Sequence, residues 1–216
     1  MQVARRRPRR GSFAAPHPSL DSPGMETFSA LLLAYLLGSI DFGAIVPRLM
    51  GVDIYEHGSG NPGASNVFRT LGKKAGGLVM AGDALKGLAG AGIADLWVGE
   101  TVGFAAAFLA VVGHVFPVFF KFKGGRGVAT AIGAVLWLEP LFGLVLTALW
   151  VGIVLVLKVA SIGSLTAMAL YVPGFAITGH RGWSLVWAGA GAVLVVVRHT
   201  PNIRRMISGS ERRVTK

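Results

Sequence analysis

The sequence predicts an all-α polytopic membrane protein, with about seven transmembrane helices and three polar loops that form one site. Three observations predict this class. Of 216 residues, 53% are hydrophobic and 14% are charged, with a mean hydropathy of +0.61, which does not suit a water-soluble domain. Apolar segments long enough to cross the ~30 Å hydrocarbon layer as helices recur along the chain. The basic residues lie mainly in short polar stretches between these segments.

Six apolar segments are each close to the ~20 residues that a spanning helix needs. They cover residues 28–50, 75–98, 101–120, 141–157, 162–178 and 184–197. A seventh apolar segment, 128–138, is shorter than an ordinary crossing. Whether it counts as a crossing depends on the side of the membrane on which the loops lie.

The distribution of charge predicts the topology. Beyond the N-terminal arginines, most cations lie in three segments: 51–74, 121–126 and the tail from residue 198. The positive-inside rule places these segments in the cytoplasm. The opposite turns carry Asp95, Glu100, Glu139 and Arg181. An even number of crossings must then separate residues 126 and 198, so 128–138 counts as a short crossing. The prediction is seven helices with the N-terminus outside.

Residues 1–24 are predicted to be a disordered or optional N-terminal extension, followed by one integral-membrane domain, 25–216. The extension contains five arginines and a Pro/Ser/Gly-rich stretch without apolar periodicity. Met25 stands directly before the first span and reads as a natural start. A protein that starts there avoids placing the arginines outside, against the positive-inside rule.

The chain contains no cysteine, which excludes thiol nucleophiles and thiolate metal sites. Its net charge of +11 could indicate nucleic-acid binding, but the cations follow the loops of a membrane protein. No nucleic-acid partner, metal site or cofactor is therefore expected.

The first polar loop has the composition of an oxyanion site. Hydrogen-bonding side chains stand among glycines that let the backbone turn and its N–H groups converge. Those side chains belong to Ser59, Asn61, Ser65 and Asn66. Arg69 adds positive charge, as do the lysines that follow it.

The second polar loop, FKFKGGRGVAT, combines cations and glycines directly before a predicted helix. The cations are Lys121, Lys123 and Arg126, and the glycines are Gly124, Gly125 and Gly127. Backbone amides, a helix N-terminus and positive charge together favour phosphate binding. The loop lacks the Walker A pattern, which disfavours an NTPase.

The tail places His199 and Asn202 three residues apart, on a short helix or turn that begins near Pro201. Histidine can move protons near neutral pH, and asparagine can orient a hydroxyl or a phosphate. The distal Arg212, Arg213 and Lys216 are interpreted as an anchor for lipid headgroups.

Ionisable residues inside the spans are functional candidates because unpaired charge in lipid is costly. Asp83 and Lys86 lie one helical turn apart and can pair with each other. Asp41 is a similar case, whereas His114 is interpreted as a hydrogen-bonded packing residue.

Together, GSGNPGASNVFR, GHVFPVFFKFKGGRGVAT and the H-x-x-N tail resemble the three motifs of the bacterial acyl-phosphate:glycerol-3-phosphate acyltransferases, the integral-membrane PlsY family. The likeness runs from about residue 30 to residue 213. It implies acyl transfer from acyl-phosphate to the 1-hydroxyl of glycerol 3-phosphate, giving lysophosphatidate without direct use of acyl-CoA or acyl carrier protein. Implied partners are these two substrates, the lipid bilayer and the enzyme that supplies acyl-phosphate.

The resemblance carries catalytic roles onto Ser59, Arg69, His199 and Asn202, and phosphate binding onto the glycine loop. Glu211 matches a structural glutamate of the family, and together with Asp83 and Lys86 it is expected to support the site from behind. We expect Ser59 to position substrate through hydrogen bonds, since no base is identifiable beside it. His199 is the candidate proton acceptor, with a substrate phosphate as the alternative base.

Three positions depart from the family pattern. Arg126 stands where the family usually has lysine, Pro62 replaces an aliphatic residue, and Asp41 occupies a position commonly held by proline. Arginine keeps the charge but changes the hydrogen-bond geometry. The Asp41 change leaves open a paralogue that acylates a different acceptor.

Two other functions compete with acyl transfer. A transporter of an organophosphate anion could use the same polar groups, but it should bind its anion near the bilayer midplane and show internal repeats. A scaffold that binds anionic lipid would not require Ser59, Asn202 or the glycine loop.

Overall fold

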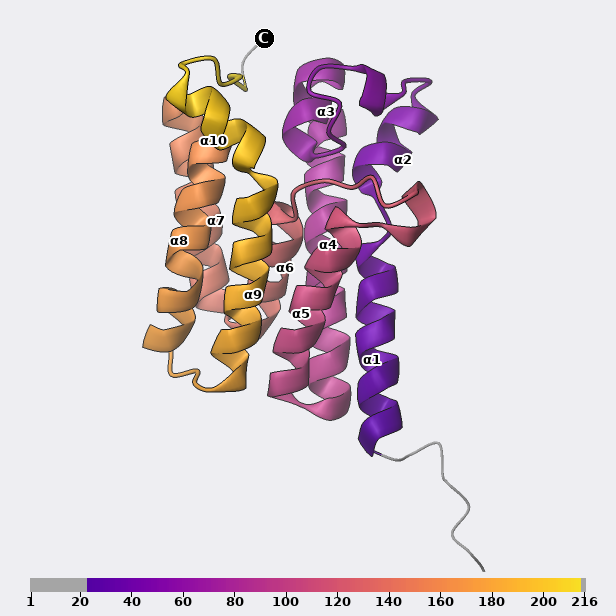
Figure 1. The fold of residues 1–216 in the computed structure, drawn as a ribbon, viewed down its shortest axis with the longest axis vertical. Helices are drawn as coiled ribbons and strands as arrows, with labels where there is room; N and C mark the ends of the chain where they lie inside the picture. Colours follow the sequence, from indigo (N-terminus) through magenta and orange to yellow (C-terminus); the bar gives the residue numbers. More distant parts are fainter. Residues whose placement is uncertain (1–22, 215–216) are drawn as a thin grey trace, which may run out of the picture.

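The computed structural model describes residues 23–214, and this part of the chain consists of helices joined by loops and turns, without strands (Figure 1). Its helices are α1 (Pro23–Gly38), α2 (Phe42–Leu49), α3 (Ala64–Leu71), α4 (Lys73–Val98), α5 (Glu100–Val115), α6 (Val128–Leu138), α7 (Pro140–Leu157), α8 (Ala160–Ile177), α9 (Trp183–Arg198) and α10 (Thr200–Ile207), with short 3-10 turns η1 (Ile54–Glu56) and η2 (Val118–Phe120). Of the predicted extension 1–24, only Pro23 and Gly24 are described, and they begin α1.

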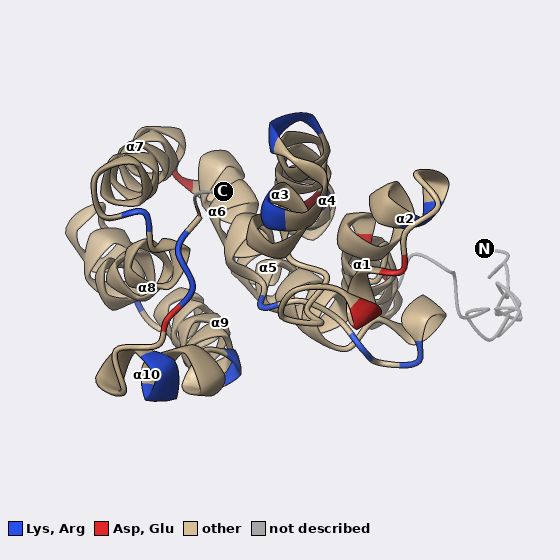
Figure 2. Ribbon diagram, turned by 90° about the horizontal axis from the view of Figure 1, so that it is seen from above, with Lys and Arg blue, Asp and Glu red and all other residues tan. Residues whose placement is uncertain are grey.

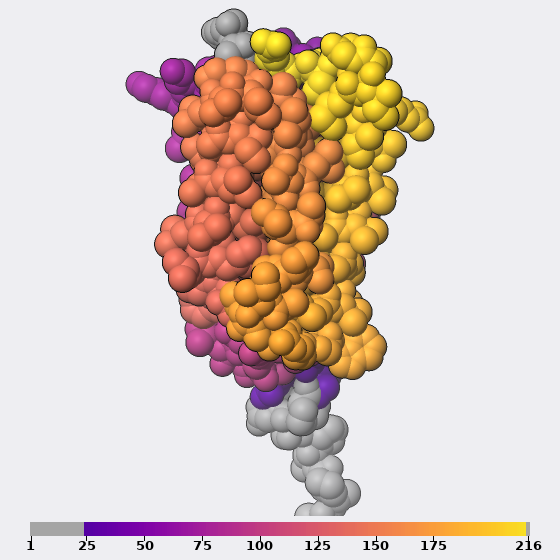
Figure 3. Space-filling model, turned by 90° about the vertical axis from the view of Figure 1, so that its left-hand side faces the viewer, coloured from indigo at the N-terminus to yellow at the C-terminus, as the bar shows by residue number. Residues whose placement is uncertain are grey.

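The long helices run up and down beside one another, and α2, α3 and α10 gather at one end, which we call the capped end (Figure 1). The helix α4 packs against α1, α5 and α6, while α9 packs against α5 and α8. The helix α7 packs only against its chain neighbours α6 and α8 among the helix pairs with substantial contact in the described chain. One lateral face is therefore formed by the last helices of the chain (Figure 3).

The described helices confirm a polytopic membrane protein. They form five stretches long and apolar enough to cross a bilayer, the first of which contains both α1 and α2, and α9 with α10, bent by 52°, would make a sixth. The segment 128–138 forms α6 with the predicted bounds. Glu139, at its end, contacts His180 in the turn between α8 and α9 at 2.8 Å. The short helix α6 thus reaches the end of the molecule opposite to the capped end.

The predicted span 28–50 corresponds to one candidate span, Gly24–Leu49, but the helix is interrupted within it. The chain breaks after Gly38, and a separate helix α2 begins at Phe42. Asp41 causes the new start because its carboxylate Oδ1 accepts a hydrogen bond from the backbone N–H of Ala44 at 3.2 Å. This is a helix N-cap, which satisfies one of the amides that a helix start leaves free.

The predicted pair of Asp83 and Lys86 is confirmed. The Lys86 Nζ lies 2.8 Å from Asp83 Oδ1 and also donates to the carbonyl oxygen of Ile40 at 2.7 Å. The ring of His114 stands 3.4 Å from the same carboxylate oxygen. All three side chains are buried, so mutual pairing offsets the cost of placing charge inside the membrane domain.

Glycine lets α4 and α6 approach closely. A Cβ added at Gly87 of α4 would lie 2.0 Å from the carbonyl oxygen of Thr130 of α6, and one added at Gly133 of α6 would lie 1.9 Å from that of Ala84. Small residues at such contacts allow the dense packing that holds membrane helices together. The pairing of α4 with α6 therefore places the beginning of α6 beside α4.

We expect Gly87→Ala to lower the free energy of unfolding by about 1–3 kcal/mol, because the added methyl forces the backbones of α4 and α6 apart. Gly152→Ala on α7 is the matched control, since a Cβ there meets nothing within 4 Å. Thermal unfolding of both variants in detergent measures the difference. Equal midpoints would show that the contact between α4 and α6 tolerates expansion.

Candidate active site

Three helices begin at the same cavity, and none of them has a side-chain cap. Their N-cap residues are Gly63 before α3, Gly127 before α6 and Val159 before α8. Residues of the first turn of each helix line the cavity. Because uncapped N-termini present free N–H groups and the positive end of the helix dipole, their convergence favours an anionic ligand.

Asn66 organises the first loop. Its Oδ1 accepts from the backbone N–H of Ser59 at 2.9 Å, and its Nδ2 donates to the carbonyl oxygen of His57 at 2.9 Å. The same Oδ1 accepts from Arg69 at 3.5 Å. Asn66 is almost fully buried, so it fixes the positions of Ser59 and Arg69 at the cavity.

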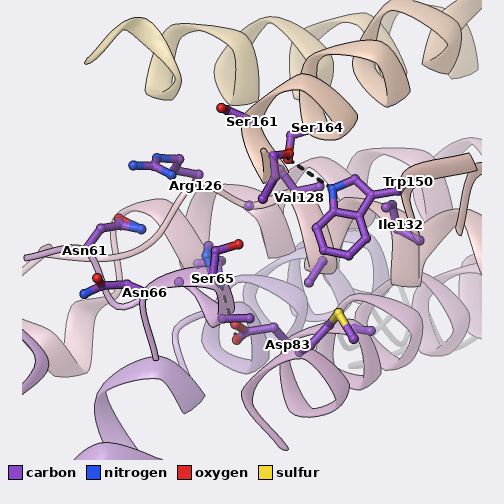
Figure 4. Close-up of a pocket in the computed structure, with 18 of the residues that line it drawn as sticks. Asn61, Ser65, Asn66, Asp83, Arg126, Val128, Ile132, Trp150, Ser161 and Ser164 are labelled. Atoms are coloured by element: carbon purple, nitrogen blue, oxygen red, sulfur yellow. Dashed lines mark hydrogen bonds and ion pairs between the residues drawn. The ribbon is translucent and has the colours of Figure 1, made fainter. Parts of the chain in front are cut away.

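The second loop folds tightly against the end of α5. The N–H groups of Gly124 and Gly125 donate to the carbonyl oxygens of Val115 and His114 at 3.2 and 3.1 Å. Any Cβ at Gly125 would lie 2.2 Å from the His114 ring, so only glycine fits there. These two amides hold the loop in place, and the loop in turn directs Arg126 and the start of α6 towards the cavity (Figure 4).

The third segment is the junction of α9 and α10. The Nδ1 of His199 lies 2.8 Å from the carbonyl oxygen of Val195. A carbonyl only accepts, so Nδ1 carries the proton and the Nε2 of the neutral ring is an acceptor. The helix α10 begins directly after His199, as expected from Pro201 near its start, and it carries Asn202.

Glu211 binds several groups around Asn202. Its carboxylate accepts from Asn202 Nδ2, from the hydroxyl of Ser161 at 2.8 Å and from Arg205 Nε at 2.8 Å. Burial raises the pKa of Glu211, but these hydrogen bonds outweigh burial and hold the pKa below its usual value. The Oδ1 of Asn202 is buried and has no protein partner, so it is available to a ligand.

The cavity at which the three helices begin is polar at one side and apolar at the other (Figure 4). We call it the large cavity, to distinguish it from a small polar pocket beside it. It has a volume of about 270 Å³. Its polar lining includes Ser59, Asn61, Ser65, Asn66, Arg69, Asp83, His114, Arg126, Ser161, Ser164 and His199, and its apolar lining includes Met80, Val128, Ile132, Leu136, Trp150 and Val151. The indole N–H of Trp150 donates to the Ser164 hydroxyl at 3.2 Å, which fixes the ring at the apolar side.

Two further spaces adjoin the large cavity. A small polar pocket shares Ser59, Ser65, Arg69, Arg126, Ala160 and Ser161 with it and adds Asn202, Arg205, Glu211 and Arg212. A groove of about 660 Å³ shares Met80, Trp150 and Val151 and continues between α4 and α7. The site can thus hold anionic groups near the capped end and an apolar chain beside them.

The site carries an excess of positive charge, and basic stretches of α3, α10 and the C-terminal segment surround it when seen from above (Figure 2). Burial, followed by repulsion from Arg205, lowers the pKa of Arg126 to about 10. Burial and the nearby Arg212 also lower the pKa of Arg69. Both arginines remain charged at neutral pH, and a bound anion would relieve their repulsion.

Most of the predicted site residues line the large cavity or the small polar pocket, and those that line neither are Lys86, Lys121, Lys123, Gly124 and Gly125. Lys121 and Lys123 are exposed and line none of the three spaces. The predicted amides of Gly124 and Gly125 are used within the loop rather than offered to a ligand. Asp83 lines the large cavity, while Lys86 lies behind it on the same ion pair.

Four residues that were not predicted also line the site: Ser161, Ser164, Trp150 and Arg205. The two serines lie one turn apart at the start of an apolar span, where polar residues are unusual. That spacing was the available signal. Arg212, interpreted from sequence as part of a headgroup anchor, lines the small pocket.

Among residues 23–214, no group of three or more metal-ligating side chains could hold an ion.

Residues 28–209 match the family model described as glycerol-3-phosphate acyltransferase. The chain belongs to the glycerol-3-phosphate acyltransferase family. It is 42% identical over 189 residues to the glycerol-3-phosphate acyltransferase of Sinorhizobium medicae, covering 87% of this chain and 92% of the relative. It is 41% identical to the Bacillus subtilis protein of the same name over 185 residues, covering 85% and 95%.

Solved structures of the family have the same fold as this chain. The glycerol 3-phosphate form of PlsY, described as an integral membrane glycerol 3-phosphate acyltransferase, superposes with a TM-score of 0.83 at 41% identity. The match covers 87% of this chain and 94% of the PlsY chain. A second PlsY structure, in the lysophosphatidic acid form, has a TM-score of 0.81. The family resemblance inferred from the three motifs is confirmed.

Glu211→Gln is expected to lower kcat/KM roughly tenfold, because a neutral amide weakens the charge-assisted hydrogen bonds to Arg205 and Asn202 by about 1–2 kcal/mol. Glu56→Gln removes the same charge from an exposed position on η1 and serves as the control. Steady-state rates in detergent measure both variants. If the two variants were equally active, the carboxylate would not be needed to orient Asn202.

Proposed function

We propose that this protein transfers a fatty acyl group from an acyl-phosphate to the 1-hydroxyl of glycerol 3-phosphate, giving lysophosphatidate and inorganic phosphate. One observation carries the proposal. Three uncapped helix N-termini, Arg69 and Arg126 meet at a cavity that continues into an apolar groove. Such a site accommodates two phosphate groups and one acyl chain.

The chemistry asks little of the protein beyond positioning. In acyl-phosphate the leaving phosphate is already activated, so the enzyme must align the acceptor hydroxyl with the carbonyl carbon. The hydroxyl oxygen forms the new ester bond, the bond between the carbonyl carbon and the phosphate oxygen breaks, and the hydroxyl proton passes to His199 Nε2. No covalent enzyme intermediate is required, and no cofactor takes part.

The remaining residues hold the two anions. We assign Arg69 and Arg126 to the phosphates, together with the free amides of α3, α6 and α8. Ser59, Asn61 and Ser65 contribute hydrogen bonds from the first loop, and the free Oδ1 of Asn202 accepts from the 2-hydroxyl of glycerol 3-phosphate, which leaves the proton of the 1-hydroxyl for His199. Asp41 lines none of these spaces, which favours glycerol 3-phosphate over a different acceptor.

The donor assay tests this function directly. Purified protein receives glycerol 3-phosphate with either palmitoyl-phosphate or palmitoyl-CoA. We expect phosphate release and lysophosphatidate only with palmitoyl-phosphate, and loss of both in Asn202→Ala. Turnover with palmitoyl-CoA would show that the donor is an acyl thioester and not an acyl-phosphate. Uptake of organophosphate into vesicles without acylation would favour the transporter.

We further propose that the site faces the cytoplasm, since the basic segments gather at the capped end. The start of α1, at the opposite end, then lies outside (Figure 1). Because the chain has no cysteine, a single Ser210→Cys variant can be labelled selectively. Labelling of intact cells by an impermeant thiol reagent would contradict this orientation. Labelling only after permeabilisation would agree with it.

A further inference from the structure

The segment from Phe116 to Lys123, which we call the Phe-Lys loop, has no role in the proposed chemistry. Four of its apolar side chains are 40–61% exposed: Phe116, Val118, Phe119 and Phe122. Lys121 and Lys123 are exposed as well and line none of the cavities. Exposed phenylalanines that alternate with lysines require an environment that is both apolar and anionic.

The position of the Phe-Lys loop provides that environment. It contains the end of the apolar stretch Glu100–Phe120, which is long enough to cross a bilayer. The loop projects sideways near the end of α1, whose Tyr35 it contacts, and lies nearer the spans than α3 does (Figure 1). Because the apolar stretch ends here, we expect the hydrocarbon layer to give way to lipid headgroups at this depth, where aromatic rings and lysines are favoured.

The backbone holds these side chains outwards. Lys121 and Phe122 have φ angles of 53° and 60°, in the left-handed region that bulky residues rarely adopt. The hydroxyl of Tyr35 donates to the carbonyl oxygen of Phe116 at 3.0 Å, and that of Tyr55 donates to the carbonyl oxygen of Lys123 at 2.8 Å. Both ends of the loop are therefore tied to the body of the protein.

The Phe-Lys loop is also connected to the site. Lys123 directly precedes Gly124, whose carbonyl oxygen accepts from Arg198 at 3.3 Å. The guanidinium of Arg198 lies 5.8 Å from the centre of the Phe116 ring. Arg126 follows two residues after Gly124, so the loop and the site arginine share one short stretch of backbone.

We propose that the Phe-Lys loop is an interfacial lipid-binding element, in which Phe119 and Phe122 enter the leaflet and Lys121 and Lys123 bind the headgroups of anionic phospholipids. Charge complementarity identifies the occupant, since two exposed lysines at headgroup depth attract phosphate-bearing lipids over zwitterionic ones. The two lysines thus bind lipid phosphate rather than the substrate phosphate that their sequence pattern suggested.

Labelling at a single cysteine tests the apolar half of the proposal. Phe119→Cys, or Val118→Cys as a second attachment point, carries an environment-sensitive fluorophore in vesicles of phosphatidylcholine and phosphatidylglycerol. We expect a blue-shifted emission that lipids brominated near the headgroup quench and aqueous iodide does not. Ser210→Cys, on the exposed C-terminal segment, should show the reverse. Quenching of the loop probes by iodide alone would overturn the proposal.

The lysines are tested by Lys121→Gln/Lys123→Gln in the labelled protein. Brominated phosphatidylglycerol should quench the loop probe more than brominated phosphatidylcholine, and we expect this preference to fall roughly fivefold per lysine at low salt. Lys74→Gln/Arg204→Gln removes the same charge from exposed residues elsewhere and should leave the preference unchanged.

Kinetics in micelles show whether the two lysines bind the phosphate of a lipid headgroup or the phosphate of the substrate. In neutral detergent, the lysine double variant should keep the wild-type KM for glycerol 3-phosphate, because no anionic lipid is present. A tenfold or larger rise in KM there would assign the lysines to substrate and overturn the proposal. The fluorescence result does not require turnover, so failure of the proposed acyl transfer would be seen separately.

Discussion

Arg126→Ala is expected to lower kcat/KM for glycerol 3-phosphate by about 10²–10³, the effect of removing one strong charge-assisted contact from a reacting group. Arg126 lines both the large cavity and the small polar pocket, beside the uncapped start of α6. Because Arg126 is buried at the site among other arginines, its positive charge balances the negative charge of the bound substrate. Release of phosphate from palmitoyl-phosphate in detergent measures the loss.

Two variants make this result specific. Arg204→Ala removes an exposed arginine of α10 that lines no described cavity, and it should leave kcat/KM within twofold. Arg126→Lys should recover part of the activity, since lysine keeps the charge without the planar fork of donors. Wild-type activity in Arg126→Ala would mean that the helix N-termini and Arg69 hold both phosphates without it.

His199→Ala is expected to lower kcat by about 10²–10⁴, the usual effect of removing a general base. The hydrogen bond between Nδ1 and the carbonyl of Val195 fixes the tautomer in which Nε2 accepts a proton. The KM for glycerol 3-phosphate should change much less than kcat, because the arginines and helix amides provide the binding. Single-turnover rates with saturating substrates measure the chemical step.

His57→Ala is the matched control, since His57 is exposed on the first loop and its ring bonds only to the carbonyl oxygen of Asp53 among the contacts in the described chain. It should keep a near-normal kcat. A His199→Ala protein that retains kcat would assign the proton to a substrate phosphate instead. A loss confined to KM would make His199 a group that orients the acceptor.

The helices themselves were largely predictable. The apolar runs determine where the chain crosses lipid, and the bounds of α6 agree with the segment 128–138. The first span was predicted in extent, but its break was not, because a single residue, Asp41, begins a second helix within an otherwise apolar run. Its capping hydrogen bond is a local contact that hydropathy does not register.

The candidate site was predictable in composition but not in detail. Arg69, Arg126, His199 and Asn202 were predicted from polar patterns between apolar runs, and the structure brings all four around adjoining cavities. Lys121 and Lys123 share a motif with Arg126, yet the tight turn at Gly124 and Gly125 directs them away from it. Ser161 lies in an apolar span, so nothing local linked it to Glu211, fifty residues later.

The sequence by itself determined the class of protein, the approximate spans and the residue types that handle phosphate, because hydropathy, positive charge and glycine content act locally. The tertiary structure decided which of those residues share a site. Close glycine contacts between α4 and α6, and the carboxylate of Glu211 between α8 and α10, set distances that no spacing along the chain records. Convergence of three uncapped helix N-termini is therefore a property of packing, since each helix start looks ordinary when read alone.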